Sequence, residues 1–200
     1  MAKVKICGLT RPQDIQAVNI YKPDYIGFVF DSTRRRYVPP EDAAKLKSRL
    51  SPDIAVVGVF VNEIKEYVAK LLKQNLIDIA QLHGQETEEE IQWIQEQTGK
   101  PVIKAVAVRS ESDISHWAGS HADYLLFDNG IGGTGRTFDW TLLSGYTKPY
   151  FLAGGLTADN LPAALAKGAY AVDLSGGAET DGVKDPAKIA EIIRIVRSYV

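Results

Sequence analysis

Residues 149–179 read PYFLAGGLTADNLPAALAKGAYAVDLSGGAE and contain one complete repeat of the pattern that predicts the architecture. An apolar run over 149–153 opens the segment and a second apolar run over 169–174 follows, each of a length that suits a strand. Between them, Thr157 occupies an expected helix N-cap position and Gly168 is a helix stop signal. This order is typical of two parallel strands joined by a helix.

The same alternation extends outward to both ends of the chain. Short β-branched or apolar runs predict eight strands, near residues 3–7, 24–30, 55–61, 77–82, 102–106, 123–128, 149–153 and 169–174. Their near-regular spacing leaves room for one helix between each pair of strands. Continuous apolar runs of this length suit parallel strands that are covered on both faces.

The segments between the strands carry helix signals. Proline is favoured in the first turn of a helix, and Ser, Thr and Asp are favoured at its N-cap. The sequence has such residues at Pro12, Pro40, Pro186, Thr87, Ser110, Thr157 and Asp185. In the last segment, apolar residues recur with the spacing of one helix face and predict a stripe that packs on a sheet: Ile189, Ile192, Ile193 and Val196.

Eight such units allow a closed barrel or an open doubly wound sheet, and the pattern alone does not choose between them. We expect an α/β fold of the closed kind, a (β/α)8 TIM barrel. Eight is its natural strand number, and polar or glycine-rich residues follow nearly every strand, where a barrel places its active-site loops. With 200 residues, against about 250 in a typical barrel, the loops must be short. No linker or composition shift divides the sequence, so we expect a single domain over residues 1–200.

Composition narrows the classes of partner. A formal net charge of -2 leaves no basic surplus to hold a polyphosphate backbone, which argues against nucleic acid. The start of the chain has no apolar stretch long enough for a signal peptide or a membrane span, so we expect a cytoplasmic protein without membrane contact. Its one cysteine, Cys7, rules out an internal disulfide. No unusually apolar outer face stands out, and a monomer is expected.

Glycine pairs follow the last two predicted strands. Gly154-Gly155 follows one, and Gly176-Gly177, preceded by Ser175, follows the other. Glycine lets backbone N–H groups approach an anion closely, and barrels often bind phosphate after strands seven and eight. Either pair alone is better explained as a tight turn, but two pairs at adjacent strand ends favour a small phosphorylated substrate.

A third glycine cluster, GIGGTGRTFDW at 130–140, follows the sixth strand and contains Gly133 and Gly135. Glycine permits the movement that a loop over an active site needs. We expect a lid that excludes water from the substrate, with a solvated turn as the alternative.

Two candidate catalytic residues end strands whose carboxyl ends would converge on one rim of a barrel. Cys7 ends the first strand. A lone cysteine is more often an inert buried residue, but nearby positive charge at the rim would favour a thiolate acting as base or nucleophile. Asp128 ends the sixth strand, where partial burial lets a carboxyl keep its proton and act as a general acid. The alternative for Asp128 is a turn-forming Asp-Asn-Gly.

Polar residues at other strand ends are candidates for substrate contact, namely Arg36, Gln81, His83 and Asp173. In the run from Arg34 to Arg36, two side chains are expected to be solvated. One is expected to point inward and pair with a substrate carboxylate through its planar fork. His83 is open to three interpretations: a metal ligand, a base or a polar wall residue. A metal is the weakest of these, because no second histidine has ligand spacing, and we expect no metal and no cofactor.

Eight motifs occur in order along almost the whole chain: KVKICGLT, GFVF followed by Arg36-Tyr37, VGVFVN, QLHG, the aspartate of LLFD, GGTGRTFDW, AGGL and VDLSGG. Together they resemble the phosphoribosylanthranilate isomerase family. The resemblance implies a (β/α)8 barrel enzyme of tryptophan biosynthesis. The implied reaction is an Amadori rearrangement of N-(5-phospho-β-D-ribosyl)anthranilate to 1-(2-carboxyphenylamino)-1-deoxyribulose 5-phosphate.

The resemblance also implies residue roles. Asp128 would protonate the ribose ring oxygen as the general acid, and Cys7 would remove the C2′ proton as the general base. Arg36 would engage the anthranilate carboxylate, the glycine pairs would hold the phosphate, and the Gly133 to Gly135 loop would be the lid. Where the family usually reads Asp-Val-Ser-Ser-Gly-Val-Glu, this chain has Gly176 in place of the second serine. One hydroxyl donor is therefore missing while the backbone donors remain, which affects phosphate affinity more than reaction type.

Two other functions compete with this interpretation. A pentose-phosphate epimerase of the same barrel type would place several metal-binding His and Asp residues at the rim, whereas this sequence offers His83 alone among the histidines there. A non-catalytic barrel that binds a phosphorylated ligand would keep the phosphate loops and lose the acid and the base. The presence of both Cys7 and Asp128 argues against it.

Overall fold

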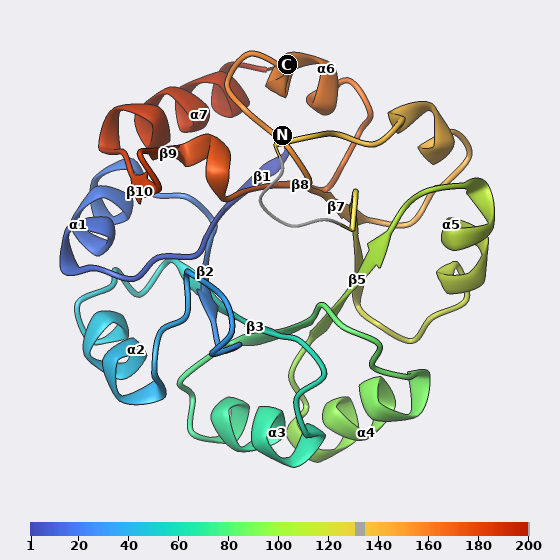
Figure 1. The fold of residues 1–200 in the computed structure, drawn as a ribbon, viewed down its shortest axis with the longest axis horizontal. Coiled ribbons are helices and arrows are strands. Elements are labelled where there is room, and N and C mark those ends of the chain that lie inside the picture. Colours follow the sequence, from blue (N-terminus) through green and yellow to red (C-terminus); the bar gives the residue numbers. More distant parts are fainter. Residues whose placement is uncertain (131–134, 200) are drawn as a thin grey trace.

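The computed structural model describes residues 1–130 and 135–199. Within these residues, parallel strands β1 to β8 pair in sequence order and close into a barrel ringed by helices (Figure 1). The strands are β1 (Lys3–Cys7), β2 (Tyr25–Val29), β3 (Ala55–Phe60), β4 (Ile79–Leu82), β5 (Val102–Ala107), β6 (Tyr124–Asp128), β7 (Tyr150–Leu152) and β8 (Ala171–Leu174). The predicted (β/α)8 barrel is confirmed, and the open sheet is excluded because β1 pairs with β8.

Helices follow most of the strands. They are α1 (Pro12–Tyr21), α2 (Pro40–Lys47), α3 (Lys65–Lys73), α4 (Glu88–Thr98), α5 (Glu111–Trp117), α6 (Leu161–Leu165) and α7 (Pro186–Ser198). The predicted prolines begin α1, α2 and α7, and Thr87, Ser110 and Asp185 are N-caps as predicted. The prediction for Thr157 is wrong. The N-cap of α6 is Asn160, whose Oδ1 accepts a hydrogen bond from the Thr157 N–H.

The connection between β6 and β7 departs from the expected pattern. Within its described part, residues 135–149, the helical element is a short 3-10 helix, η1 (Trp140–Leu143), rather than an α-helix. Asp139 caps η1 by accepting from the Thr141 N–H, and Gly145 adopts a left-handed φ of 91° just after it. The short distance to β7 leaves little room for further turns.

An antiparallel hairpin after β8 was not predicted. Strands β9 (Glu179–Thr180) and β10 (Val183–Lys184) pair across Asp181-Gly182. Asp181 and Gly182 have φ values of 50° and 78°, the left-handed conformation that suits a two-residue hairpin turn. Asp-Gly is a strong sequence signal for this turn, so the sequence did contain it. In Figure 1 the hairpin lies near α1 and α7.

The inside of the barrel is apolar at one end and polar at the other. Alternate residues of a strand share a face. Val4 and Ile6 pack in the core between barrel and helices, so Lys5 and Cys7 point into the barrel. An inner apolar cluster, which includes Phe151, fills the barrel below them. The buried polar residues that point inward are Lys5, Gln81, Asp128 and Asp173.

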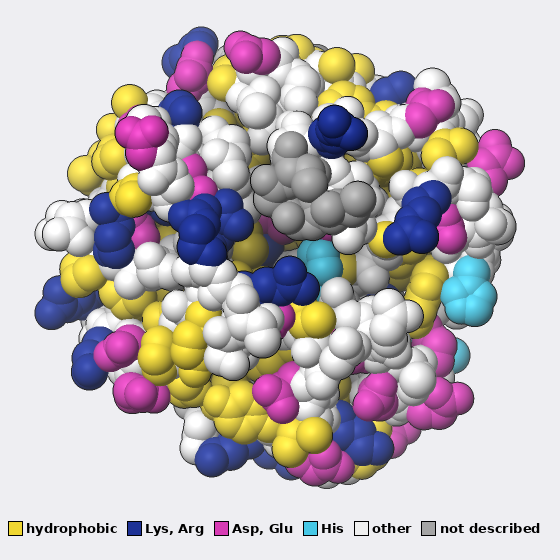
Figure 2. All heavy atoms as spheres, viewed as in Figure 1, with side chains coloured by type: hydrophobic (Ala, Val, Ile, Leu, Met, Phe, Trp, Pro, Cys, Tyr) yellow, Lys and Arg dark blue, Asp and Glu magenta, His cyan; other side chains and the backbone are white. Residues whose placement is uncertain are grey.

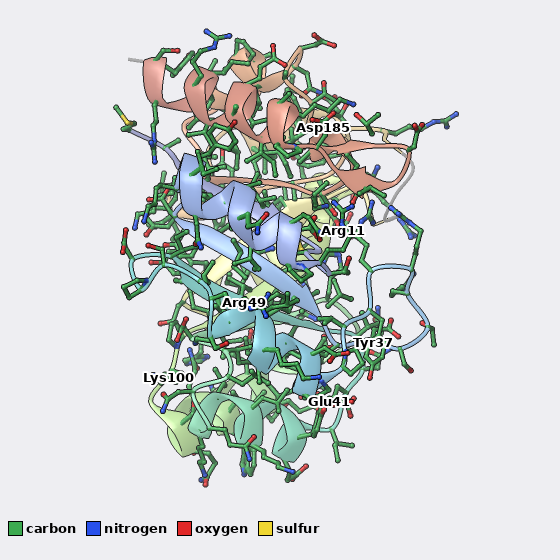
Figure 3. All side chains as sticks on the ribbon, turned by 90° about the vertical axis from the view of Figure 1, so that its left-hand side faces the viewer. Arg11, Tyr37, Glu41, Arg49, Lys100 and Asp185 are labelled. Carbon is green, nitrogen blue, oxygen red and sulfur yellow. The ribbon has the colours of Figure 1, made fainter. Side chains whose placement is uncertain are left out.

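The two ends of the barrel are clearly separated in side view (Figure 3). Arg11 and Tyr37 follow the carboxyl ends of β1 and β2, and they lie on the opposite side of the molecule from Arg49 and Lys100, which precede β3 and β5. The candidate site residues follow carboxyl ends and therefore belong to the first side. No helix within the described ranges is long and apolar enough to cross a membrane.

Glu179 ties the unpredicted hairpin to the loop after β2. Its buried carboxylate accepts hydrogen bonds from Arg36 Nε at 2.6 Å, Arg35 Nη2 at 2.7 Å and Lys184 Nζ at 2.6 Å. Burial raises the pKa of Glu179, but the hydrogen bonds and charges of these partners outweigh burial and hold that pKa at about 2. The ionised carboxylate therefore stabilises the folded state.

We predict that Glu179→Gln lowers the free energy of unfolding at neutral pH by about 2 kcal/mol, because it removes the charge from a buried network. The folded pKa lies below the ordinary value of 4.5, so this contribution is complete above that value and is lost as the pH falls through about 2. Urea unfolding at several pH values measures it. Glu191→Gln, at an exposed position on α7, is the control. Equal losses in the two variants at neutral pH would contradict the prediction.

Candidate active site

Cys7 and Asp128 occupy the carboxyl ends of two strands of the barrel. Cys7 is the last residue of β1, and Asp128 is the last residue of β6. Both are buried, with exposed fractions of 9% and 6%. Since alternation points both side chains inward, they face the same polar end of the barrel interior from different sides. The predicted convergence on one rim is therefore the arrangement seen.

Asp128 is held by two contacts. Its Oδ1 accepts a hydrogen bond from the Gly130 N–H at 2.7 Å, and its Oδ2 lies 3.0 Å from His83 Nε2. His83 Nδ1 lies 2.9 Å from Gln81 Nε2. An amide nitrogen only donates, so neutral His83 accepts at Nδ1 and carries its proton on Nε2, facing Asp128. The three residues form a chain in which a proton can be exchanged between imidazole and carboxyl.

Cys7 lies among charged groups. Burial raises the pKa of the Cys7 thiol, the ammonium groups of Lys5 and Lys184 oppose this, and Asp173 adds to it, so that the pKa stays above its ordinary value. Cationic neighbours, expected from the rim position of Cys7, are thus present, but burial has the larger effect. Ser175 Oγ donates to the Cys7 carbonyl at 3.0 Å and fixes the backbone at this point.

Asp173 points into the barrel next to Cys7. Its Oδ2 accepts a hydrogen bond from Lys5 Nζ at 2.8 Å. Its Oδ1 is buried and has no hydrogen-bond partner among the described residues. A buried carboxylate oxygen without a donor is costly, and it is the kind of atom that a bound hydroxyl group satisfies.

Arg36 is the inward-pointing member of its arginine run, as predicted. Its side chain is 22% exposed, against 59% and 57% for Arg34 and Arg35. Glu179 takes the edge of the Arg36 fork that carries Nε and Nη2, which leaves the edge formed by Nη1 and Nη2 to face other groups. Gly8 makes this position possible, because a Cβ there would lie 2.4 Å from Arg36 Cδ.

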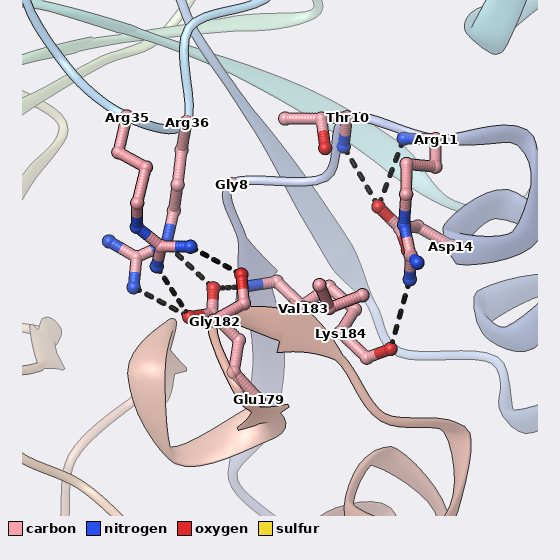
Figure 4. A pocket seen from close by; sticks show the side chains of 10 residues that line it. All are labelled: Gly8, Thr10, Arg11, Asp14, Arg35, Arg36, Glu179, Gly182, Val183 and Lys184. Carbon is pink, nitrogen blue, oxygen red and sulfur yellow. Dashed lines mark hydrogen bonds and ion pairs between the residues drawn. The ribbon is translucent and has the colours of Figure 1, made fainter.

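A small cavity of about 50 Å³ lies beside this arginine. Figure 4 shows its lining, which includes Arg11 and Asp14 from the start of α1 and Glu179 and Lys184 from the hairpin. The lining includes neither Cys7 nor Asp128. A pocket that holds a drug-sized ligand has about 300 Å³ or more, so this cavity is too small to be the substrate site and is a neighbour of it.

The two glycine pairs lie side by side. A Cβ on Gly177 would lie 2.0 Å from the Leu156 carbonyl oxygen, so the loops after β7 and β8 are in direct contact. Within the described residues, the N–H groups of Gly154 and Gly155 make no hydrogen bond. Gly176-Gly177 begins a short 3-10 helix, η2 (Gly176–Ala178), whose first N–H groups have no partner in the helix. These donors fit an anion, whereas Ser175 Oγ is already occupied by Cys7.

The predicted lid falls partly outside what the structure covers. Gly133 lies outside the described residues, and Gly135 is exposed with a φ of 69°. The backbone of Gly135 and Arg136 packs against Gly155, within 3 Å of where its Cβ would stand. The segment therefore returns next to the predicted phosphate loop, and the lid stays a prediction.

Several charged residues of the site were missed in the sequence. Lys5, Lys184 and Glu179 lie close to the predicted residues and were not singled out. Lys5 did leave a signal, because a lysine inside the buried strand KVKIC needs a buried partner. Figure 2, viewed along the barrel, shows Lys and Arg side chains gathered near the centre of this face.

The electrostatics of this end favour bound anions. In the described part of the site, the cations Lys5, Arg35, Arg36 and Lys184 pair with the carboxylates of Asp173 and Glu179. Four positive charges against two negative ones leave a surplus for a substrate with carboxylate and phosphate groups. No group of three or more His, Cys, Asp or Glu residues suited to a metal ion occurs within the described ranges.

Comparisons with known proteins agree with the motifs. Residues 4–195 match the family described as N-(5'-phosphoribosyl)anthranilate (PRA) isomerase. A protein of that name from Endomicrobium trichonymphae is 46% identical, covering 99% of this chain and 100% of its own length. The crystal structure of the phosphoribosyl anthranilate isomerase from Thermotoga maritima is similar with a TM-score of 0.90 and 35% identity, covering 98% of this chain and 99% of its own.

A further solved structure carries a ligand. It is a phosphoribosyl anthranilate isomerase in complex with reduced 1-(o-carboxyphenylamino)-1-deoxyribulose 5-phosphate, with a TM-score of 0.88 and 34% identity over 98% of this chain and 99% of that one. The match over nearly the full length, rather than over the barrel geometry alone, separates this chain from barrel enzymes of other families, including the epimerase alternative. The chain therefore belongs to the N-(5'-phosphoribosyl)anthranilate isomerase family.

Proposed function

We propose that this chain converts N-(5-phospho-β-D-ribosyl)anthranilate to 1-(2-carboxyphenylamino)-1-deoxyribulose 5-phosphate in tryptophan biosynthesis, with Asp128 as the general acid and Cys7 as the general base. The observation that carries the proposal is the pair of buried proton-transfer groups at one end of a barrel, in a chain of this family. The reaction needs one acid and one base, and these two groups supply them.

Ring opening is the step assigned to Asp128. The carboxyl donates its proton to the ribose ring oxygen as the bond from C1′ to that oxygen breaks, and the nitrogen lone pair forms the Schiff base. The contact between Asp128 Oδ2 and His83 Nε2 at 3.0 Å gives the carboxyl a neighbour that can restore its proton. Gln81 supports this arrangement by orienting the His83 ring.

Proton removal from C2′ is the step assigned to Cys7. The thiolate takes the proton, the electron pair of the C–H bond forms the double bond from C1′ to C2′, and the cationic nitrogen becomes neutral. The enolamine then tautomerises to the ketone. Because the proton at C2′ is acidified by the Schiff base, a thiolate is a sufficiently strong base at neutral pH.

Binding is assigned to the groups around these two residues. The free edge of the Arg36 guanidinium is suited to the anthranilate carboxylate, and the backbone donors at Gly154-Gly155 and Gly176-Gly177 are suited to the phosphate. Asp173 Oδ1 is available to a substrate hydroxyl. We further expect a cytoplasmic monomer that uses no cofactor.

The first test is Asp128→Asn. An amide cannot donate the proton that ring opening needs, so kcat is expected to fall by about 100-fold or more while KM changes little. The assay forms the substrate in solution and follows the loss of anthranilate-type fluorescence. A folded variant that keeps the wild-type rate would remove Asp128 from its role, and a folded wild-type protein without activity would refute the proposed reaction.

The second test is Cys7→Ser. A serine hydroxyl is a far weaker base than a thiolate, and we expect kcat to fall by about 100-fold or more. In the wild-type protein, activity should rise with pH as the thiol ionises, and the raised pKa places this rise above the ordinary range for cysteine. Activity that survives the substitution and keeps the same pH profile would show that another group is the base.

The third test concerns substrate binding. Arg36→Lys keeps the charge but loses the planar fork that holds both Glu179 and a carboxylate, so KM is expected to rise about tenfold with a smaller change in kcat. Arg34→Lys is the matched control, because Arg34 is exposed and pairs with Asp31. Similar KM values for both variants would rule out Arg36 as the group that binds the carboxylate.

A further inference from the structure

Lys5 is a fully buried lysine next to the proposed base. Its exposed fraction is 0%, and it stands on β1 two residues before Cys7 and on the same face of the strand. A buried ammonium needs a partner, and Lys5 Nζ donates to Asp173 Oδ2 at 2.8 Å. The ammonium group also interacts with the Cys7 side chain through charge and a hydrogen bond.

The geometry gives the Lys5 ammonium two acceptors, a carboxylate and a sulfur. In register, Lys5 lies directly opposite Asp173 across the pair formed by β1 and β8. Gly27, which is opposite Cys7 on β2, leaves space for the sulfur, since a Cβ there would lie 2.7 Å from Sγ. Cys7 Sγ therefore sits in a cradle that is lined by an ammonium group on its own strand and by no side chain on the next strand.

Other charged groups face this sulfur from every neighbouring element that carries one in the described residues. Asp173 on β8 opposes the thiolate, while Lys184 on β10 and Arg36 in the loop after β2 favour it. Lys184 is already held by Glu179 Oε1 at 2.6 Å and by the Ser175 carbonyl at 3.1 Å. Lys5 is thus the cation with both charge attraction and a hydrogen bond toward Cys7.

We propose that Lys5 is a positioning residue for the isomerase reaction, and that its ammonium group stabilises the thiolate of Cys7 that accepts the C2′ proton. This inference rests on the proposed function. Lys5 keeps its own proton throughout: the thiolate becomes a thiol when it accepts the C2′ proton, and no covalent bond to Lys5 forms or breaks. Although burial lowers the pKa of Lys5, Asp173 and Cys7 raise it further, so the side chain stays charged.

The proposal predicts that Lys5→Met makes Cys7 harder to ionise. The pH dependence of alkylation by iodoacetamide, followed by mass spectrometry, reports this directly, because the chain has one cysteine. The midpoint of alkylation is expected to move upward by about one pH unit or more, since an opposite charge at hydrogen-bond distance typically shifts a pKa by that much. The rising limb of kcat against pH should move with it.

Lys104→Met is the matched control. Lys104 is equally buried and pairs with Glu86 at 2.7 Å, but it lies on β5, on the side of the sheet that faces the helices and Trp117. Its loss should cost comparable stability and leave the alkylation midpoint of Cys7 unchanged. A shift of equal size in this control would overturn the proposal, because it would assign the effect to loosened packing.

The double variant Lys5→Met/Asp173→Asn guards against two alternatives. It removes both charges of a buried pair, which is often tolerated where removal of one is not, so it remains informative if Lys5→Met does not fold. If Lys5 acts on the sulfur directly, the midpoint stays above that of the wild type. A return to the wild-type midpoint would mean that only the uncompensated charge of Asp173 mattered, and would refute the proposal.

The two proposals fail in distinguishable ways. If the proposed reaction is wrong, the wild-type protein shows no isomerase activity while the alkylation midpoint still depends on Lys5. If the role of Lys5 is wrong, isomerase activity is present while the midpoint in Lys5→Met equals that of the wild type. Alkylation of the Cys7→Ser variant provides the blank for both measurements.

Discussion

The ion pair between Lys5 and Asp173 lies at the seam where the barrel closes. These residues are register partners on β1 and β8, and their side chains meet inside the barrel at 2.8 Å. A buried lysine and a buried aspartate stabilise the fold only when they are paired, so closure in any other register would leave both charges unmatched. The same register places Ser175 against the Cys7 carbonyl and brings the first strand next to the glycine-rich loop after the last one.

A second carboxylate organises the surface above this seam. Glu179 gathers Arg35, Arg36 and Lys184, three cations from two separate segments of the chain. The network holds one edge of the Arg36 fork and so orients the other before any ligand arrives. Pre-orienting a side chain in this way reduces the conformational entropy that binding must cost. The hairpin β9–β10 is thus a structural support for the site and is small because it needs only to present Glu179 and Lys184.

Much of the fold and part of the site could be predicted because their signals are local. Apolar runs give strand positions to within two residues at each end, and first-turn prolines mark helix starts. Cys7, Asp128 and His83 were found because each follows directly from a strand end. The position of Lys5 opposite Asp173 and the contacts of Glu179 depend on register between distant segments, which no local pattern encodes. Thr157 was misplaced because Asn160, equally suited to capping, competes for the same turn.

The surroundings of Cys7 and Asp128 divide the two chemical roles between them. The described contacts of Asp128 are the Gly130 N–H and His83, a group that can return a proton to it. Cys7 instead lies within reach of ammonium groups, which favour the form that lacks a proton. When the environments of two titratable groups differ in this direction, one is suited to donate and the other to accept. Because β7 and β8 separate β6 from β1 around the barrel, the donor and the acceptor face a substrate from two sides, as ring opening at the sugar oxygen and proton removal at C2′ require.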